Sequence, residues 1–228
     1  MQLTRALRLR PREIVAFVGG GGKTTAMFRM AAEIVASGRR VITTTTTRIF
    51  AAQTRLAPAH IVVDEAMAAS WAELRAALDS YGHALVTGRV DSGIGKAFGV
   101  EPRLISQLAD LPDVSAVLVE ADGSRMRPLK APAEHEPVIP GGTTLVVAVA
   151  GADVIGKRLD DVHVHRSGLL GQILSLSPGA VVTPDVVASA IVHPLGGRKA
   201  VPAGARFVAL VNKTEGADRL GDAREIAR

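Results

Sequence analysis

The stretch Ile14-Val15-Ala16-Phe17-Val18-Gly19-Gly20-Gly21-Gly22-Lys23-Thr24-Thr25 decides the fold of this chain. Its apolar half predicts a buried strand, the four glycines predict a tight loop, and the residues from Lys23 onward predict a helix. A loop of this composition lets backbone N–H groups surround a phosphate, and the following helix points its positive end at that charge. Lys23 can then reach the terminal phosphates of a nucleotide, and the Thr24 hydroxyl can bind Mg²⁺.

The sequence therefore predicts a phosphate-binding loop for ATP or GTP, with Mg²⁺ as cofactor. The loop departs from the eight-residue G-x-x-x-x-G-K-[ST] pattern, because Phe17 stands where the first glycine belongs. Read as Gly-x-x-Gly-Lys-Thr-Thr, it is similar to the loop of the Mur-type amino-acid ligases. In another register it resembles the loop of MinD-like ATPases, with Val18 in place of their signature lysine. A plain glycine-rich turn is the alternative. The predicted nucleotide-binding residues of this loop are Gly19, Gly20, Gly21, Gly22, Lys23, Thr24 and Thr25.

Length and composition favour one large α/β domain over residues 1–228. Hydrophobic residues make up 47% of the chain, yet no apolar run is long enough to cross a membrane. Only 3% of residues are aromatic, which leaves little for base stacking, and the net charge of +5 is scattered along the chain. We therefore expect neither a nucleic acid nor a membrane as partner. Without cysteine or a secretory signal, a cytoplasmic location is expected.

The order of predicted elements indicates a doubly wound α/β fold with a mostly parallel sheet. Residues 88–99 hold four glycines and read either as a mobile loop over a site or as a surface loop. The threonines at 43–47 either contact phosphate or Mg²⁺ or merely favour a strand. We predict strands at 12–18, 40–44, 60–64, 84–87, 114–119, 144–150 and 206–211. Helices are predicted at 23–37, 67–78 and 101–109, with another from Thr183.

Two acids follow the strand predicted at 114–119. Glu120 and Asp122 stand where a Walker B acid would hold Mg²⁺ together with Thr24, since Mg²⁺ prefers hard oxygen ligands. The sequence does not decide which of the two faces the metal. An ordinary acidic loop is the alternative.

The segment 123–137 combines three cations, two carboxylates, a histidine and three prolines between two strands. Prolines hold such a loop in a fixed shape, which suits a binding wall. We predict a second, anion-binding pocket here, next to the γ-phosphate and separate from the base site at Asn212. Arg125 would also complete a catalytic site with Lys23 and Asp122. A purely structural ion cluster is the alternative. The predicted substrate residues of the segment are Arg125, Arg127, Lys130, Glu134 and His135.

Two further groups are candidates for a site. His163 and His165 project to one side of an extended segment and could bind a substrate or, with Asp161 or Asp153, a metal; a hydrogen-bonded loop pair is the ordinary alternative. The last predicted strand ends in Asn212-Lys213-Thr214-Glu215, which resembles the guanine-reading Asn-Lys-x-Asp element of GTPases. Glu215 replaces the aspartate, so the preference for guanine is a hypothesis.

Taken together, these motifs resemble the YqeC family, known as selenium cofactor biosynthesis or selenium-dependent hydroxylase accessory proteins. The likeness covers nearly the whole chain and departs at Glu215, where related sequences carry aspartate. It rests on the glycine loop, the threonine run ending in Arg48-Ile49, residues 119–124, the Pro-Leu-Lys to Val-Ile-Pro stretch at 128–140, residues 163–166 and Asn212-Lys213.

The resemblance implies a P-loop NTPase fold and a role in maturing a selenium-containing molybdenum hydroxylase. The second ligand, for which the three cations of residues 123–137 suit a second phosphate, would then be selenophosphate-like or of the molybdopterin type, and the hydroxylase would be a partner. The chain has no cysteine on which to carry selenium. Three functions follow as hypotheses: an NTPase, a nucleotide-gated binding module or chaperone with little activity alone, and a Mur-like phosphoryl transferase or ligase.

Overall fold

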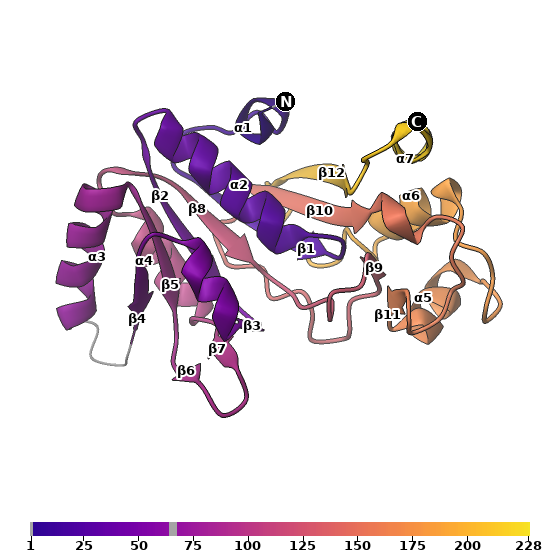
Figure 1. Cartoon of the computed structure of the whole chain (residues 1–228), viewed down its shortest axis with the longest axis horizontal. Coiled ribbons are helices and arrows are strands. Elements are labelled where there is room, and N and C mark those ends of the chain that lie inside the picture. The colour runs from indigo at the N-terminus through magenta and orange to yellow at the C-terminus, as the bar shows by residue number, and fades with distance from the viewer. Residues whose placement is uncertain (1, 64–67) are drawn as a thin grey trace. The chain divides into compact units, whose positions relative to one another are not determined.

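The computed structural model describes residues 2–63 and 68–228, which form two compact units (Figure 1). Of the described residues, the first unit takes 2–16, 24–63, 68–121 and 138–145, and the second takes 17–23, 122–137 and 146–228. Strand β1 (Glu13–Gly19) begins in the first unit and ends in the second. The expectation of one domain over residues 1–228 stays a prediction.

The central sheet confirms the predicted α/β, doubly wound fold. Besides β1, its strands are β2 (Arg40–Thr45), β4 (His60–Val62), β5 (His83–Thr87), β8 (Val114–Glu120), β10 (Leu145–Gly151) and β12 (Arg206–Asn212). The seven strands are parallel and follow the order β12-β10-β1-β8-β2-β5-β4. Strands β8 and β10 are nearly continuous buried apolar runs, as expected where helices flank a parallel sheet.

The first unit has its core between the sheet and helices α3 and α4. Ile42, Val86 and Val117 of the sheet pack with Leu74 of α3 and Ile105 of α4, and all five side chains are buried. The predicted helix at 67–78 corresponds to α3, although Met67 lies outside the described residues, as does Asp64 of the predicted strand at 60–64. The helices of this unit are α1 (Leu3–Ala6), α2 (Lys23–Ala36, which starts at the end of the second unit), α3 (Ala68–Tyr81) and α4 (Pro102–Ala109).

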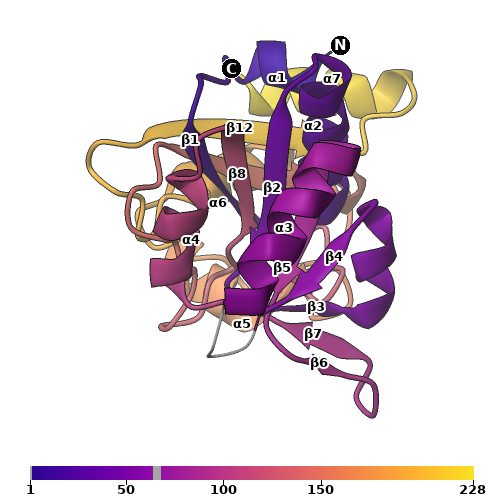
Figure 2. The same ribbon diagram turned by 90° about the vertical axis from the view of Figure 1, so that its left-hand side faces the viewer.

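Residues 88–99 correct the prediction of a loop. They contain β6 (Val90–Asp91) and β7 (Lys96–Phe98), which join β3 (Arg48–Phe50) in a three-stranded antiparallel sheet (Figure 2). Cations stack on its aromatic rings: the Arg89 guanidinium carbon lies 3.9 Å from the centre of the Phe98 ring, and Lys96 lies over Phe50. Glycine content suggested a loop, whereas these pairings stabilise a small sheet. The 3₁₀ helix η1 (Ala51–Leu56) follows β3.

In the second unit, most of the chain after β10 is helical or forms turns. Short strands β9 (Leu129–Lys130) and β11 (Val164–His165) pair in parallel beside α5 (Figure 1). As predicted, Thr183 caps a helix, its Oγ1 accepting a hydrogen bond from the N–H of Val186. The remaining elements are η2 (Ala152–Val154), α5 (Ser167–Leu174), α6 (Pro184–Val192) and α7 (Ala217–Ile226). Within the described ranges, no helix is both long and apolar enough to cross a bilayer.

Candidate functional site

The glycine loop of the second unit packs closely against neighbouring backbone. The N–H of Gly20 donates to the carbonyl of Val149, and the N–H of Gly21 donates to the carbonyl of Arg127. Gly21 has a φ of +73°, and a Cβ there would lie 2.1 Å from the amide nitrogen of Gly151. No other residue fits that position. The N–H of Gly19 also donates, to Asp122, so three loop amides are engaged inside the protein and an incoming phosphate would meet the amides from Gly22 onward.

Lys23 folds back along the loop. Its Nζ donates a 2.6 Å hydrogen bond to the carbonyl of Gly19 and lies 3.2 Å from Oδ1 of Asp122. Both side chains are only 2% exposed. A buried cation needs such partners because removing it from water is costly. To meet a nucleotide phosphate, the lysine would exchange these contacts for phosphate oxygens.

Asp122 holds the glycine loop and contacts two lysines. Its Oδ2 accepts a hydrogen bond of 3.0 Å from the N–H of Gly19 and lies 3.0 Å from Nζ of Lys130. Its buried Oδ1 makes no hydrogen bond to a residue that the structure describes, although the Lys23 ion pair reaches it. The structure therefore places this predicted metal ligand among cations, and its role toward Mg²⁺ stays a prediction.

In the first unit, Thr24 and Glu120, two of the predicted metal ligands, contact each other. The Thr24 hydroxyl donates a 2.6 Å hydrogen bond to Oε2 of Glu120, and Nε2 of Gln53 lies 3.2 Å from the same hydroxyl. Glu120 is 8% exposed. A hydroxyl beside a carboxylate supplies two hard oxygen ligands, so this pair fits Mg²⁺. Gln53 was not predicted, because nothing in its local sequence pattern places it beside Thr24.

The threonine run has a structural role in its first three members. The Thr43 hydroxyl lies 2.9 Å from Nε2 of His83, and the Thr44 hydroxyl donates to the carbonyl of Val86. Thr45 donates to the carbonyl of Glu120, and all three threonines are fully buried. Their hydroxyls hold strand β2 to its neighbours. Burial lowers the pKa of His83 to about 4, so its ring is neutral at neutral pH.

The segment 123–137 divides into a buried and an exposed part. Lys130 Nζ donates a 2.7 Å hydrogen bond to Oε2 of Glu136, and that oxygen also accepts a 2.7 Å hydrogen bond from Arg166. Burial raises the pKa of Glu136, but the bonds from Lys130 and Arg166 outweigh it and bring the pKa to about 2. Glu134 and His135 are exposed on the adjacent turn. The predicted structural alternative thus holds for Lys130, whereas Arg125 and Arg127 line a separate hollow.

The two histidines play different parts. Nδ1 of His163 lies 2.8 Å from Oδ1 of Asp160, a local hydrogen-bonded pair. His165 faces the hollow that Arg125 and Arg127 line. Among the residues that the structure describes, no three His, Asp or Glu side chains are grouped so as to hold a metal ion.

The Asn-Lys-x-Glu element contributes a brace to the glycine loop. Asn212 Nδ2 donates a 3.1 Å hydrogen bond to the carbonyl of Gly21, and Lys213 Nζ pairs with Oδ2 of Asp153 at 2.7 Å. Glu215 is exposed. A Cβ on Gly22 would lie 2.4 Å from Nδ2 of Asn212. The reading of guanine by these residues stays a prediction, whereas their contact with the loop and η2 is a feature that the motif did not reveal.

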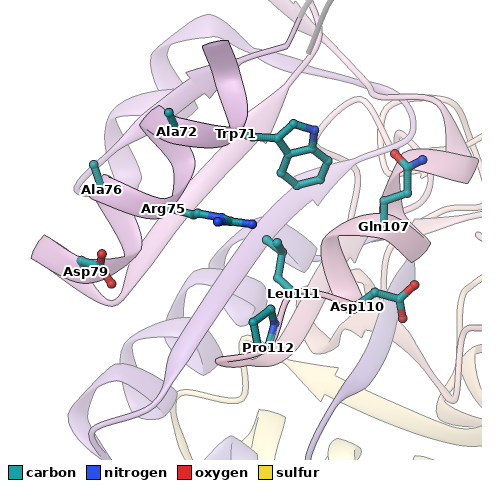
Figure 3. A pocket seen from close by; sticks show the side chains of 9 residues that line it. All are labelled: Trp71, Ala72, Arg75, Ala76, Asp79, Gln107, Asp110, Leu111 and Pro112. Atoms are coloured by element: carbon teal, nitrogen blue, oxygen red, sulfur yellow. The ribbon is translucent and has the colours of Figure 1, made fainter. Parts of the chain in front are cut away.

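A large open hollow of about 950 Å³ lies between α3 and α4 in the first unit (Figure 3). Trp71 and Arg75 extend from α3 toward Gln107 and Leu111. Trp71 packs against the core of the first unit but remains half-buried. None of the predicted functional residues lines this hollow.

The fold and loop together define a class: an α/β protein whose parallel sheet is consistent with the doubly wound P-loop type, with a glycine-rich turn after β1. A family model described as YqeC protein matches residues 15–168, so the chain belongs to the YqeC family. The "Uncharacterized protein YqeC" of Escherichia coli (strain K12) is 40% identical over 119 residues. That alignment covers 52% of this chain and 46% of the relative, so the match spans about half the length of the curated protein.

Proposed function

We propose that this chain is a Mg²⁺-dependent nucleotide-binding protein that hydrolyses ATP or GTP. The observation that carries the proposal is the 2.6 Å hydrogen bond to Glu120 from Thr24, which follows the glycine loop and Lys23 in the sequence. In phosphoryl transfer the protein mainly positions the phosphates and stabilises their charge. Lys23 supplies that charge, the amides from Gly22 onward approach the phosphate oxygens, and the Thr24–Glu120 pair holds Mg²⁺ when it is bound.

The same proposal gives the hydrolysis a purpose in cofactor maturation. Family membership supports a role for nucleotide turnover in preparing the cofactor of a selenium-containing molybdenum hydroxylase, the partner that the sequence resemblance implies. The chain has no cysteine, so selenium would stay on a bound ligand or on the partner. Arg125 is a candidate for the cation that completes the reaction on such a ligand.

One observation favours a second candidate, a nucleotide-gated binding module that turns over slowly alone. Lys23 is held by Gly19 and Asp122 in a buried ion pair, and it must leave both before it can serve a phosphate. An enzyme with this arrangement works slowly until a partner or second ligand rearranges the pair. A basal rate that rises strongly with an added hydroxylase would favour this reading.

Nucleotide binding is tested by thermal unfolding of the full chain with ATP, ADP, GTP or GDP, each with and without Mg²⁺. A ligand at a hundredfold excess over its Kd stabilises the folded state by about 2.7 kcal/mol, so binding raises the melting temperature by several degrees. Lys23→Ala should abolish the shift, whereas Lys157→Ala, an exposed lysine of the same unit, should retain it. A Lys23→Ala protein that is folded and binds Mg-nucleotide as tightly as the parent would refute the assignment.

A further inference from the structure

We propose that a hollow in the second unit is a binding site for a phosphate dianion, either free or as the terminal group of a small molecule. The hollow has a volume of about 290 Å³ and lies apart from the glycine loop residues. Its lining is formed by Arg125, Arg127, Asp161, His165 and Arg166. Three guanidinium groups around one cavity form the donor set that phosphate oxygens require, because each guanidinium offers paired N–H groups in a planar fork.

Two of the arginines keep donors available. Arg125 makes no hydrogen bond or ion pair to a residue within the described ranges 2–63 and 68–228. Arg127 donates from Nε to the carbonyl of Asp161 at 2.9 Å, which fixes the plane of its guanidinium. The terminal nitrogens of Arg127 have no partner in the part of the chain that the structure describes. Arg127 is thus a fixed donor with unsatisfied N–H groups, and it loses little side-chain entropy when it binds an anion.

The third arginine is held in place by the protein. One terminal nitrogen of Arg166 donates to Glu136 at 2.7 Å and to the carbonyl of Ala131 at 3.2 Å. Glu136 is shared with Lys130, so its single charge faces two cations. The charge of Arg166 is therefore only partly neutralised by Glu136, and the hollow stays positively charged on this side. The remaining N–H groups of Arg166 complete the three-sided donor set with Arg125 and Arg127.

The carboxylate in the lining does not neutralise the three arginines. Oδ1 of Asp161 accepts hydrogen bonds from the backbone N–H and the hydroxyl of Ser167, at 3.0 and 2.9 Å, at the start of α5. One negative charge, satisfied by that helix start, thus stands against three guanidinium groups. Burial, then the charges of Arg166 and Lys130, lower the pKa of His165 to about 4. The His165 ring is therefore neutral at neutral pH and adds no charge to the lining.

The backbone aims these side chains by unusual torsions. Arg125, Met126 and Arg166 have φ angles of +48°, +63° and +61°. Left-handed conformations cost energy in residues with a Cβ, and they persist where the surroundings require them, often at ligand sites. Met126, between Arg125 and Arg127, is 78% exposed, so core packing does not explain the conformation of this turn. The torsions instead direct Arg125 and Arg166 toward one cavity.

The hollow is joined to the glycine loop but does not depend on it. Gly21 donates its N–H to the carbonyl of Arg127, while the Arg127 side chain extends to the hollow. A phosphate in the hollow would therefore contact the side chain of the residue whose carbonyl holds the N–H of Gly21. The proposal stands or falls separately from nucleotide binding, because its donors are different side chains.

The test is calorimetric titration of the full chain with inorganic phosphate and, separately, with glycerol phosphate, both at saturating Mg-ADP to occupy the glycine loop. Arg125→Gln should weaken binding about tenfold or more, since a charge-assisted hydrogen-bond donor is lost from the cavity. The double variant with Arg127→Gln should abolish it. Arg158→Gln, an exposed arginine of the same unit, is the matched control and should bind like the parent. Tighter binding of inorganic phosphate identifies a free anion as ligand, and tighter binding of glycerol phosphate identifies a phosphorylated small molecule.

Two results would overturn the site. One is that neither probe binds the parent at millimolar concentration, and the other is that the folded double variant binds both as the parent does. Because Arg125 has no partner among the described residues, its replacement should leave the melting temperature unchanged, which guards against a folding artefact. If Mg-ADP fails to bind but phosphate binding still depends on Arg125, the nucleotide proposal fails and the anion site remains.

Discussion

Nζ of Lys130 lies 3.0 Å from Oδ2 of Asp122, and the two side chains are 1% and 2% exposed. The same nitrogen contacts Glu136 at 2.7 Å, so Lys130 joins the carboxylate that anchors the glycine loop to the one that holds Arg166. Buried ions are costly unless each has partners, so these residues must be present together. The predicted ligand-binding lysine is thus the centre of an ion-pair chain running from Lys23 to Arg166.

Removing Lys130 should destabilise the fold. Lys130→Met removes the buried cation that Asp122 and Glu136 share, and breaking such an ion pair costs about 3–5 kcal/mol. The free energy of unfolding from urea titration measures the loss. Lys157→Met, at an exposed position of the same unit, should change it little. Equal stability of the two variants would show that the buried chain is dispensable.

The pKa of Glu136 predicts acid sensitivity. Its pKa is about 2 in the folded chain and 4.5 in the unfolded chain. The unfolded state therefore binds more protons between these values, so the stabilisation is full above pH 4.5 and is lost as the pH falls toward about 2. The loss amounts to about 3 kcal/mol. Urea unfolding of the parent and of Glu136→Gln at a series of pH values measures the loss. The difference between their free energies of unfolding should become smaller as the pH falls from 4.5 toward about 2. A constant difference would contradict the assigned pKa.

His83 predicts a second, separate pH window. Burial lowers its pKa from 6.5 to about 4, so protonation favours the unfolded chain as the pH falls from 6.5 to 4. The stability contributed by the neutral ring is full above pH 6.5 and declines by about 3 kcal/mol toward pH 4. His83→Gln can still meet Thr43 but does not titrate, so its stability should vary less with pH in this range. Identical pH profiles for parent and variant would exclude His83 as the cause.

The sheet could be predicted from sequence because its signals are local. Runs such as 114–119 and 144–150 are apolar throughout, and burial on both faces of a parallel strand requires that composition. The glycine loop was also visible, since close backbone approach at Gly21 excludes any Cβ. The small sheet at 88–99 was not predicted, because four glycines in this stretch favour a loop. Cation–aromatic contacts from Arg48 and Arg89 to Phe98 stabilise the sheet.

The partners of the charged side chains could not be predicted. Residues 123–137 contain cations and carboxylates at short spacing, so many pairings satisfy the sequence equally well. The pairing of Lys130 with Asp122 and Glu136 depends on left-handed torsions at Arg125 and Met126. Arginine and methionine rarely adopt such torsions, so the sequence does not predict them. Arg166 was missed as a functional residue for a similar reason: Glu136 meets it from 30 positions away.

Metal dependence should follow Glu120. Glu120→Gln preserves an acceptor for the Thr24 hydroxyl but removes the charge that attracts Mg²⁺. Its affinity for Mg-ATP should fall about tenfold or more, whereas affinity for ATP in chelator should match the parent. Equilibrium binding with and without Mg²⁺ measures both values. Glu73→Gln, on the exposed face of α3, serves as control. A fall of the same size in chelator would assign Glu120 to loop structure instead.

Gly21 allows the steric requirement of the loop to be separated from its torsion. Gly21 and Gly156 have φ angles of +73° and +77°, but only at Gly21 would a Cβ meet backbone, 2.1 Å from the nitrogen of Gly151. Gly156→Ala should therefore cost about 1 kcal/mol, the usual penalty of a left-handed alanine. Gly21→Ala carries that penalty and also forces the loop away from β10, so its cost should exceed that of Gly156→Ala by about 2 kcal/mol or more. Urea unfolding of the two variants measures the difference. Equal losses would mean that the loop yields without strain, and the packing of Gly21 on Gly151 would then not be what selects glycine.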